Sequence, residues 1–239
     1  MPRNPTKGRR FAGTTTMIAL GLAAYPRATS AGEIDTLLFG SLDASAATFL
    51  TLGAKAAWGA RDQDGFVALA SLGGGHRDER GSTAARQRYT ASAALVVGYQ
   101  WFFDWGVVAA YAGPEGVRDV LLDGRGLSAL EPHLGLRLQG EIWARPTAAT
   151  LVQVSAVAGS AHDSVWARLA WGCRLWDTYL GPEVAAYTDG TGYRKWNLGL
   201  HGTDFDLGRY SFRVSAGLQS ETGRRGPGPY VALAVWSPW

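Results

Sequence analysis

Residues 164–201 decide the fold, and they read SVWARLAWGCRLWDTYLGPEVAAYTDGTGYRKWNLGLH. Alternate residues from Val165 to Leu175 are apolar, with Cys173 among them, and the residues between them include Arg168 and Arg174. A two-residue period over about a dozen positions is typical of a β-strand with one apolar and one polar face. The period returns in residues 179–187 and 195–201. The stretch predicts antiparallel strands whose charged face is the inside of a barrel, the pattern of an outer-membrane protein.

Composition agrees with this pattern. The chain has 239 residues, of which 46% are hydrophobic, 18% charged and 11% aromatic, with 32 Gly and 10 Trp. The charged fraction is below the roughly 25% of ordinary globular domains. Few charges with abundant Gly, Trp and Tyr suit strands that face lipid and carry aromatic girdles. The length suits one barrel better than two small domains.

The N-terminus predicts a cleavable secretory signal peptide over residues 1–31, with the barrel in residues 32–239. Residues 1–31 contain five basic residues and no acid, an apolar core at 17–24, and small residues at 29–31. This arrangement is typical of an export signal. Removing five of the 23 basic residues leaves 18 against 20 acidic ones, a net charge of −2. A nucleic-acid partner is therefore not indicated.

The apolar alternation predicts an all-β, antiparallel, up-and-down transmembrane β-barrel of about twelve strands. The expected strands are 36–43, 46–58, 66–74, 89–103, 106–112, 131–144, 148–159, 165–175, 179–187, 195–201, 210–219 and 230–239. Short turns at one end, such as 104–105 and 177–178, alternate with longer loops at the other, namely 75–88, 113–128 and 221–229. An even strand number places both chain ends on the periplasmic side. Because proline cannot donate to a ladder, pairing of the last strand is expected to stop by Ser237.

The polar residues expected to face inward form the main candidate site. They are Arg137, Gln139, Glu141, Arg168, Arg174, Glu183, Lys195, Asn197 and Arg213. In a low-dielectric interior such charges must be paired. They either plug and stiffen the barrel or line a path for a sugar chain or small solute. Candidate sugar-stacking aromatics on the same faces are Trp143, Tyr179, Tyr187 and Tyr193, which could equally be interface-belt residues.

Catalysis is the competing class. The run His162-Asp163-Ser164 offers the residue types of a surface lipid hydrolase, although a working triad is assembled by the fold rather than by sequence adjacency. Asp163 and Ser164 are explained by a turn. Glu141 and Glu183 could act as a glycosidase pair, but neighbouring arginines would keep both ionised. The sequence has no metal-ligand spacing, phosphate loop or nucleotide motif, so no cofactor and no metal is expected.

Several segments resemble the cellulose biosynthesis protein BcsS family. They are 166–174, 179–183, 193–201, 214–217 and 228–231, with weaker likeness at 40–43, 97–100 and 141–143. The resemblance implies an outer-membrane protein associated with the cellulose synthase and export system. It implies a process and names no catalytic residue.

Three functions follow as hypotheses. The first is a non-enzymatic outer-membrane accessory of cellulose biosynthesis or export. Its expected partners are outer-membrane lipid, cellulose or another glucan, and the export components. The second is a porin-like channel for small solutes, and the third is a surface lipid hydrolase.

Overall fold

The computed structural model describes residues 34–45, 47–79 and 86–239. In this part of the chain all regular structure is β. The strands are β1 (Ile34–Ala44), β2 (Thr48–Trp58), β3 (Gly65–Glu79), β4 (Arg86–Phe103), β5 (Gly106–Asp123), β6 (Gly126–Ala129), β7 (His133–Thr147), β8 (Thr150–Gly159), β9 (Ser164–Leu175), β10 (Thr178–Thr188), β11 (Arg194–Leu207), β12 (Tyr210–Glu221) and β13 (Gly228–Pro238). The predicted signal peptide lies outside the described residues.

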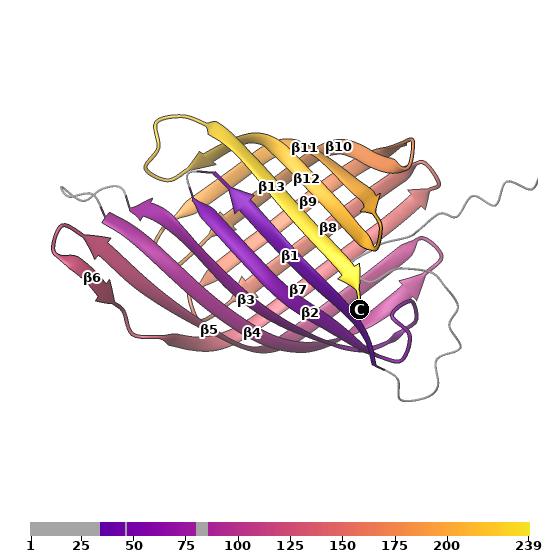
Figure 1. Cartoon of the computed structure of the whole chain (residues 1–239), viewed down its shortest axis with the longest axis horizontal. Coiled ribbons are helices and arrows are strands. Elements are labelled where there is room, and N and C mark those ends of the chain that lie inside the picture. The colour runs from indigo at the N-terminus through magenta and orange to yellow at the C-terminus, as the bar shows by residue number, and fades with distance from the viewer. Residues whose placement is uncertain (1–33, 46, 80–85) are drawn as a thin grey trace, which may run out of the picture.

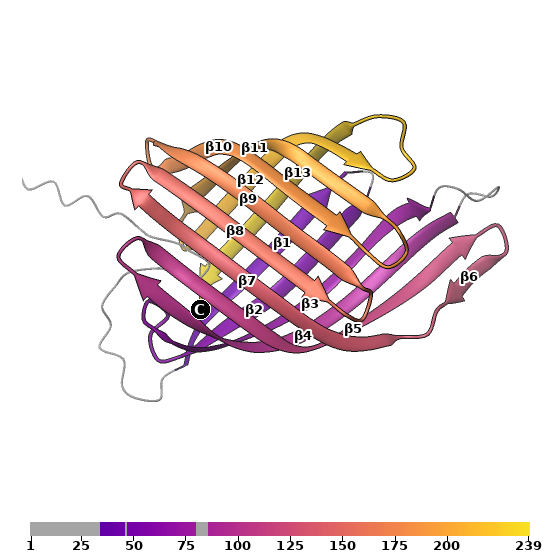
Figure 2. The ribbon, with the colours of Figure 1, turned by 180° about the vertical axis from the view of Figure 1, so that it is seen from behind.

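Neighbouring strands pair in antiparallel fashion and close into a barrel. The sheet runs β4-β3-β2-β1-β13-β12-β11-β10-β9-β8-β7-β5, and the β4–β5 pairing joins its two ends. The short β6 pairs with β5 alone and stands outside the ring. The predicted up-and-down barrel of twelve strands is therefore confirmed (Figure 1, Figure 2).

The two ends of the barrel differ. At the turn end lie the connections at 59–64, 104–105, 148–149, 176–177 and 208–209, together with the start of β1 and the end of β13. The opposite, loop end carries the longer connections, including 189–193 and 222–227. Strands β4 and β5 rise beyond the rest of the loop end, and β6 projects with them (Figure 1).

Two predicted loops are wrong. Most of 75–88 belongs to β3 and β4, which stay paired up to Glu79 opposite Arg86. Most of 113–128 belongs to β5 and β6, with β5 continuous to Asp123. The charges there do not interrupt the strands because they pair across them: Arg88 forms ion pairs with both Glu79 and Asp119. The third predicted loop is present between Glu221 and Gly228.

The end of the chain also differs from expectation. Pro238 lies opposite Leu37, and the backbone nitrogen of Trp239 donates to the carbonyl of Thr36 at 2.9 Å. Pairing with β1 therefore continues past Ser237. A proline is tolerated here because it comes at the end of the ladder rather than in its middle.

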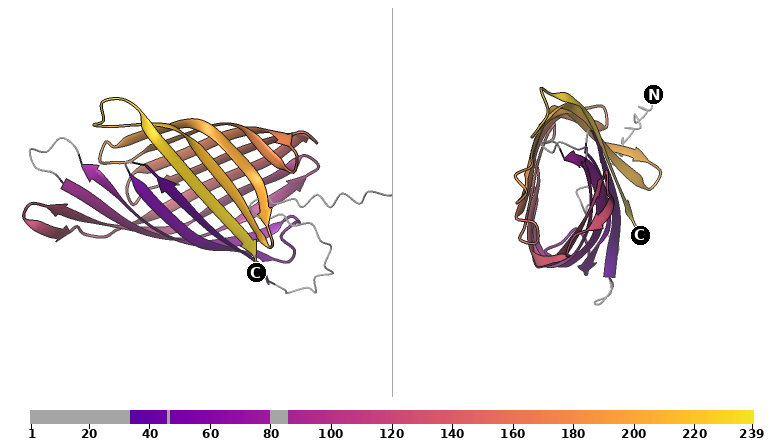
Figure 3. Two further views of the ribbon diagram at one scale, coloured as in Figure 1. Left: turned by 45° about the horizontal axis from the view of Figure 1, so that its top comes forward. Right: turned by 90° about the vertical axis from the view of Figure 1, so that its left-hand side faces the viewer.

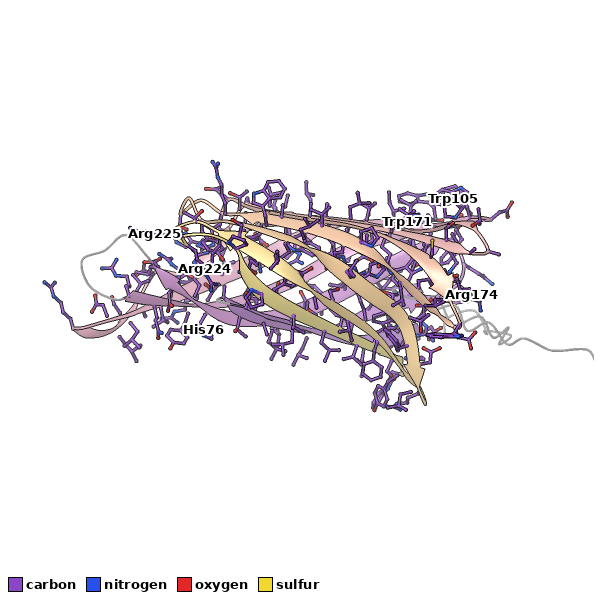
Figure 4. The ribbon with its side chains drawn as sticks, turned by 90° about the horizontal axis from the view of Figure 1, so that it is seen from above. His76, Trp105, Trp171, Arg174, Arg224 and Arg225 are labelled. Atoms are coloured by element: carbon purple, nitrogen blue, oxygen red, sulfur yellow. The ribbon has the colours of Figure 1, made fainter. Side chains whose placement is uncertain are left out.

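Side chains alternate between the two faces of the wall as predicted. Leu134 is 86% exposed, and Leu136 and Leu138 follow it on the outside. The outward positions in the middle of the strands are mostly Leu, Val, Ile, Ala or aromatic residues. Outward aromatics gather towards the turn end, where Trp105 and Trp171 lie near Arg174 (Figure 4).

The barrel is oval in cross-section (Figure 3), and its interior is filled with side chains. Along β2–β5 six inward residues, Ala57, Val67, Leu69, Val96, Ala109 and Tyr111, form one buried apolar cluster. Along β8–β13 they include buried Gln153, Glu183, Arg213 and Gln219. The prediction of a charged inner face thus holds for the C-terminal wall. The N-terminal wall combines the apolar cluster with buried Lys55, Glu115 and Asp119.

Candidate functional site

The candidate site is the barrel interior, where side chains from separate strands are joined at three levels. We call these the apolar plug at the turn end, the central network, and the loop-end network. Each level joins residues that are distant in sequence.

The central network is built on Arg213, which is 3% exposed. Its guanidinium contacts the Glu183 carboxylate and the side-chain oxygen of Gln153. Its Nε also donates to Ser215 Oγ at 3.4 Å, and Ser215 Oγ donates to Glu183 at 3.3 Å. Strands β8, β10 and β12 are thereby held together through one cation. A buried cation with this many partners stabilises the fold, because loss of Arg213 or Glu183 would leave the other charge buried without compensation.

Two inward glycines make room for the remaining partner of Glu183. The register aligns Glu183 with Gly199, Gly199 with Gly217, and Gly217 with Tyr230. Because neither intervening position has a side chain, Tyr230 reaches across β12 and β11, and its hydroxyl donates to Glu183 Oε1 at 3.4 Å. A Cβ at Gly199 would lie 2.6 Å from that hydroxyl. The strands carry these glycines where the tyrosine needs the space.

A second polar ladder runs along β7. Arg137 donates to Gln139 at 3.2 Å, and Gln139 donates to Glu141 at 2.7 Å. Glu141 also lines a small cavity of about 10 Å³ with Lys55, Trp143 and Ser155. That volume is about the size of one water molecule. It is too small for a sugar ring.

The remaining predicted inward residues have separate surroundings. Lys195 Nζ lies 2.9 Å from Asp43 Oδ2 and ties β11 to β1. Asn197 is buried, and Arg168 lies over the ring of Trp166 at 5.7 Å. Arg174 stands apart at the turn end, where it bonds the carbonyl of Trp176 and the carboxylate of Asp177.

The apolar plug fills the turn end. It consists of Leu37, Val107, Trp143, Leu151, Tyr179 and Trp236, all at most 6% exposed. The rings of Trp143 and Trp236, from β7 and β13, meet edge to face with centroids 6.2 Å apart. Arg145 covers Tyr179 at 5.3 Å and binds Asp204 at 2.9 Å. Trp143 and Tyr179 are thus packed inside the plug and do not present open ring faces.

The loop-end network crosses the mouth of the barrel. Arg77 on β3 donates to Asp189 at 2.7 Å and to Thr191 Oγ1 at 2.9 Å. Strands β3 and β10 lie on opposite sides of the ring, so this ion pair spans the opening. Burial alone would raise the pKa of Asp189, but hydrogen bonds from Thr191 and Arg77 hold that pKa below its ordinary value. Asp189 therefore stays ionised and the bridge stays formed at neutral pH.

The other two candidate aromatics belong to this network. Tyr187 donates to Asp189 at 3.2 Å, and its ring lies 6.0 Å from that of Tyr193. Arg77 covers the Tyr193 ring at 4.2 Å, and the Tyr193 hydroxyl donates to Glu221 at 2.8 Å. Both rings are half-buried. Of the four predicted aromatics, these two lie at the loop end, and Trp143 and Tyr179 lie at the turn end.

The β8–β9 connection folds against the same mouth. His162 Nε2 lies 3.1 Å from Asp119 Oδ2, and the backbone nitrogen of Ala161 donates to Glu115 at 3.1 Å. The hydrogen bond to Asp119 raises the pKa of His162. Among the described residues, no hydrogen bond joins His162 to Ser164, so the geometry does not form the predicted Ser/His/acid arrangement.

Sequence reasoning missed several members of these networks. Gln153 and Tyr230 lie in predicted strands, but nothing in the sequence marks them as partners of Arg213 and Glu183. Arg77 and Asp189 lay in segments taken as loops or turns. The buried apolar cluster along β2–β5 had a signal: in residues 66–70 both alternating faces are apolar, which indicates a strand that is packed on its inner side as well.

Comparison with protein families decides what kind of chain this is. The family model for cellulose biosynthesis protein BcsS matches residues 37–239. The chain belongs to this family. Comparison with curated proteins gave no match.

Two solved structures are similar in outline. The beta domain of the Bordetella autotransporter BrkA matches with a TM-score of 0.40 and 14% identity, over 87% of this chain and 99% of that one. The transport unit of autotransporter AIDA-I from Escherichia coli matches with a TM-score of 0.40 and 10% identity, over 93% and 94%. TM-scores this low carry no inference about function.

Within the described residues, three or more metal-ligating side chains do not gather anywhere, and no helix has the length and apolar character needed to cross a membrane.

Proposed function

We propose that this BcsS-family protein is a non-enzymatic accessory of bacterial cellulose biosynthesis or export, located in the outer membrane. The observation that carries the proposal is the interior that is bridged at three levels, in a chain whose family serves cellulose production. A barrel filled in this way acts through its outer surface and its loop end rather than as a conduit. We propose that the protein has no catalytic, cofactor or metal site.

The outward face supports the membrane location. Exposed Leu200, Leu218 and Leu233 lie on neighbouring strands, with Trp171 and Tyr210 nearer the turn end. An apolar belt flanked by aromatics is the surface that a bilayer requires. The short turns would face the periplasm and the loop end the exterior.

The loop end is the proposed contact region for the glucan or the export components. Tyr187 and Tyr193 lie there beside Asp189 and Glu221, and aromatic rings next to carboxylates suit sugar recognition. The rings at the turn end are enclosed in the plug, so they are not proposed as sugar contacts.

The experiment compares a strain lacking this gene with its parent. Extracellular cellulose and inner-membrane synthase activity are measured together. We expect less cellulose, or cellulose of altered texture, with unchanged synthase activity. Unchanged cellulose in the deletion strain would overturn the accessory role, and complementation with the wild-type gene controls for polar effects.

A further inference from the structure

The loop end carries two exposed arginines, Arg194 and Arg225, on neighbouring connections of the barrel. Arg194 begins β11, and its backbone exchanges hydrogen bonds with Thr222: the nitrogen of Thr222 donates to the Arg194 carbonyl at 2.9 Å, and the Arg194 nitrogen donates to Thr222 Oγ1 at 3.0 Å. Arg224 and Arg225 follow in the β12–β13 loop (Figure 4). The two connections thus bring Arg194 and Arg225 to one sector of the rim, whereas the guanidinium of Arg224 packs over the inner side of Gly228.

The acidic groups nearby are already engaged. Glu221 lies 3.8 Å from Arg224 and also accepts a hydrogen bond from Tyr193. Across the described part of the chain, no ion pair involves Arg194 or Arg225, and both side chains are exposed. The sector therefore has positive charge in excess.

The position of the cluster indicates the kind of anion. Arg194 shares the outward face of β11 with Trp196, Leu198 and Leu200, which are 59%, 67% and 67% exposed. The arginines thus stand where the apolar surface ends, at the level where lipid headgroups meet a barrel. Guanidinium groups bind phosphate oxygens bidentately.

We propose that Arg194 and Arg225 form a binding site for the phosphate groups of outer-leaflet lipid. This inference rests on the proposed membrane location. The site anchors the β10–β11 and β12–β13 connections against the membrane surface, beside the loop-end network that contains Tyr193 and Glu221.

The test uses the full mature chain in detergent, titrated with diphosphorylated lipid A and with the same lipid after removal of its phosphates. We expect the phosphorylated lipid to bind more tightly. The double variant R194Q/R225Q should lose about tenfold or more in affinity for it, because the charged hydrogen bonds from both guanidinium groups to phosphate are lost. The control is R209Q, an exposed arginine over Tyr210 at the turn end, which should leave binding unchanged.

The outcomes separate the two proposals. A chain that does not associate with phosphatidylcholine vesicles without detergent contradicts the membrane location. A chain that inserts normally, but whose double variant binds lipid A like the wild type, overturns the phosphate site. Displacement of lipid A by inorganic phosphate at equal concentration would assign the site to free phosphate and overturn the lipid assignment.

Discussion

At the scale of single residues, Arg213 is the centre of the interior. Replacing it with methionine keeps most of the volume but leaves the Glu183 carboxylate buried without its cation. Breaking a buried ion pair from one side costs about 3–5 kcal/mol, so we expect a loss of that order in the free energy of unfolding, measured with urea in phospholipid vesicles. Adding Glu183→Gln should restore part of the loss, since the uncompensated charge is then gone. A double variant no more stable than the single one would contradict this account.

Gly199 tests the space that Tyr230 occupies. A valine at this inward position would place its Cβ 2.3 Å from the carbonyl of Ala216 and 2.6 Å from the Tyr230 hydroxyl. Overpacking of this kind costs about 1–3 kcal/mol, and we expect such a decrease in stability in the same urea assay. The control is Gly140→Val on β7, where a Cβ meets no atom within 4 Å. Equal effects of the two valines would show that steric crowding at Gly199 is not the cause.

At the scale of elements, the β8–β9 connection should respond to pH. The pKa of His162 is raised in the folded protein, first by its hydrogen bond to Asp119; the charges of Asp189 and Arg77 also face it, with opposite effects. A raised pKa means that the ion pair stabilises the connection fully below about pH 6.5, the ordinary value for histidine, and that this stabilisation is lost as pH rises through the folded value. We expect the protection factors of amides 160–163 to fall over that upper range in hydrogen exchange.

His162→Gln is the matched variant for this prediction, because it keeps a polar side chain that does not titrate in that range. In this variant the protection factors of amides 160–163 should not fall as pH rises above 6.5, because no histidine loses its charge beside Asp119. A pH response of the same size in His162→Gln would assign the effect to another group.

The elements also show what the sequence could predict. The two-residue period identified the strand faces and nearly every strand, because lipid outside and side chains inside impose opposite polarities on alternate positions. The period failed to predict the loop-end parts of β3–β5. There the wall extends past the apolar belt, and charged residues such as Arg88 and Glu79 pair across strands. The period also could not match partners: the contact between Arg213 and Gln153 depends on the curvature and oval closure of the sheet, which no local pattern records.

At the scale of the whole molecule, the three bridged levels predict a closed barrel. Wild-type protein in planar bilayers should show no steady ion conductance. A variant that removes one bridge from each level, with Trp143→Ala, Arg213→Ala and Arg77→Ala, should conduct, because the plug, the central network and the mouth bridge are each weakened. Steady conductance of the wild type would favour the porin-like channel, and gel mobility before and after heating checks that the variant is folded.

The barrel closes by pairing its first strand, β1, with its last strand, β13, and this pairing determines when closure can occur during folding. Leu37 pairs with Pro238, about 200 residues later, so the last seam cannot form until the final strand has been delivered. Contacts of such long range carry the largest loop entropy and form late in folding. Until then β1 and β13 each present an open edge that invites pairing with other chains. Removing β13 should therefore do more than subtract one strand: it would leave a sheet with two permanent open edges that can pair with other chains.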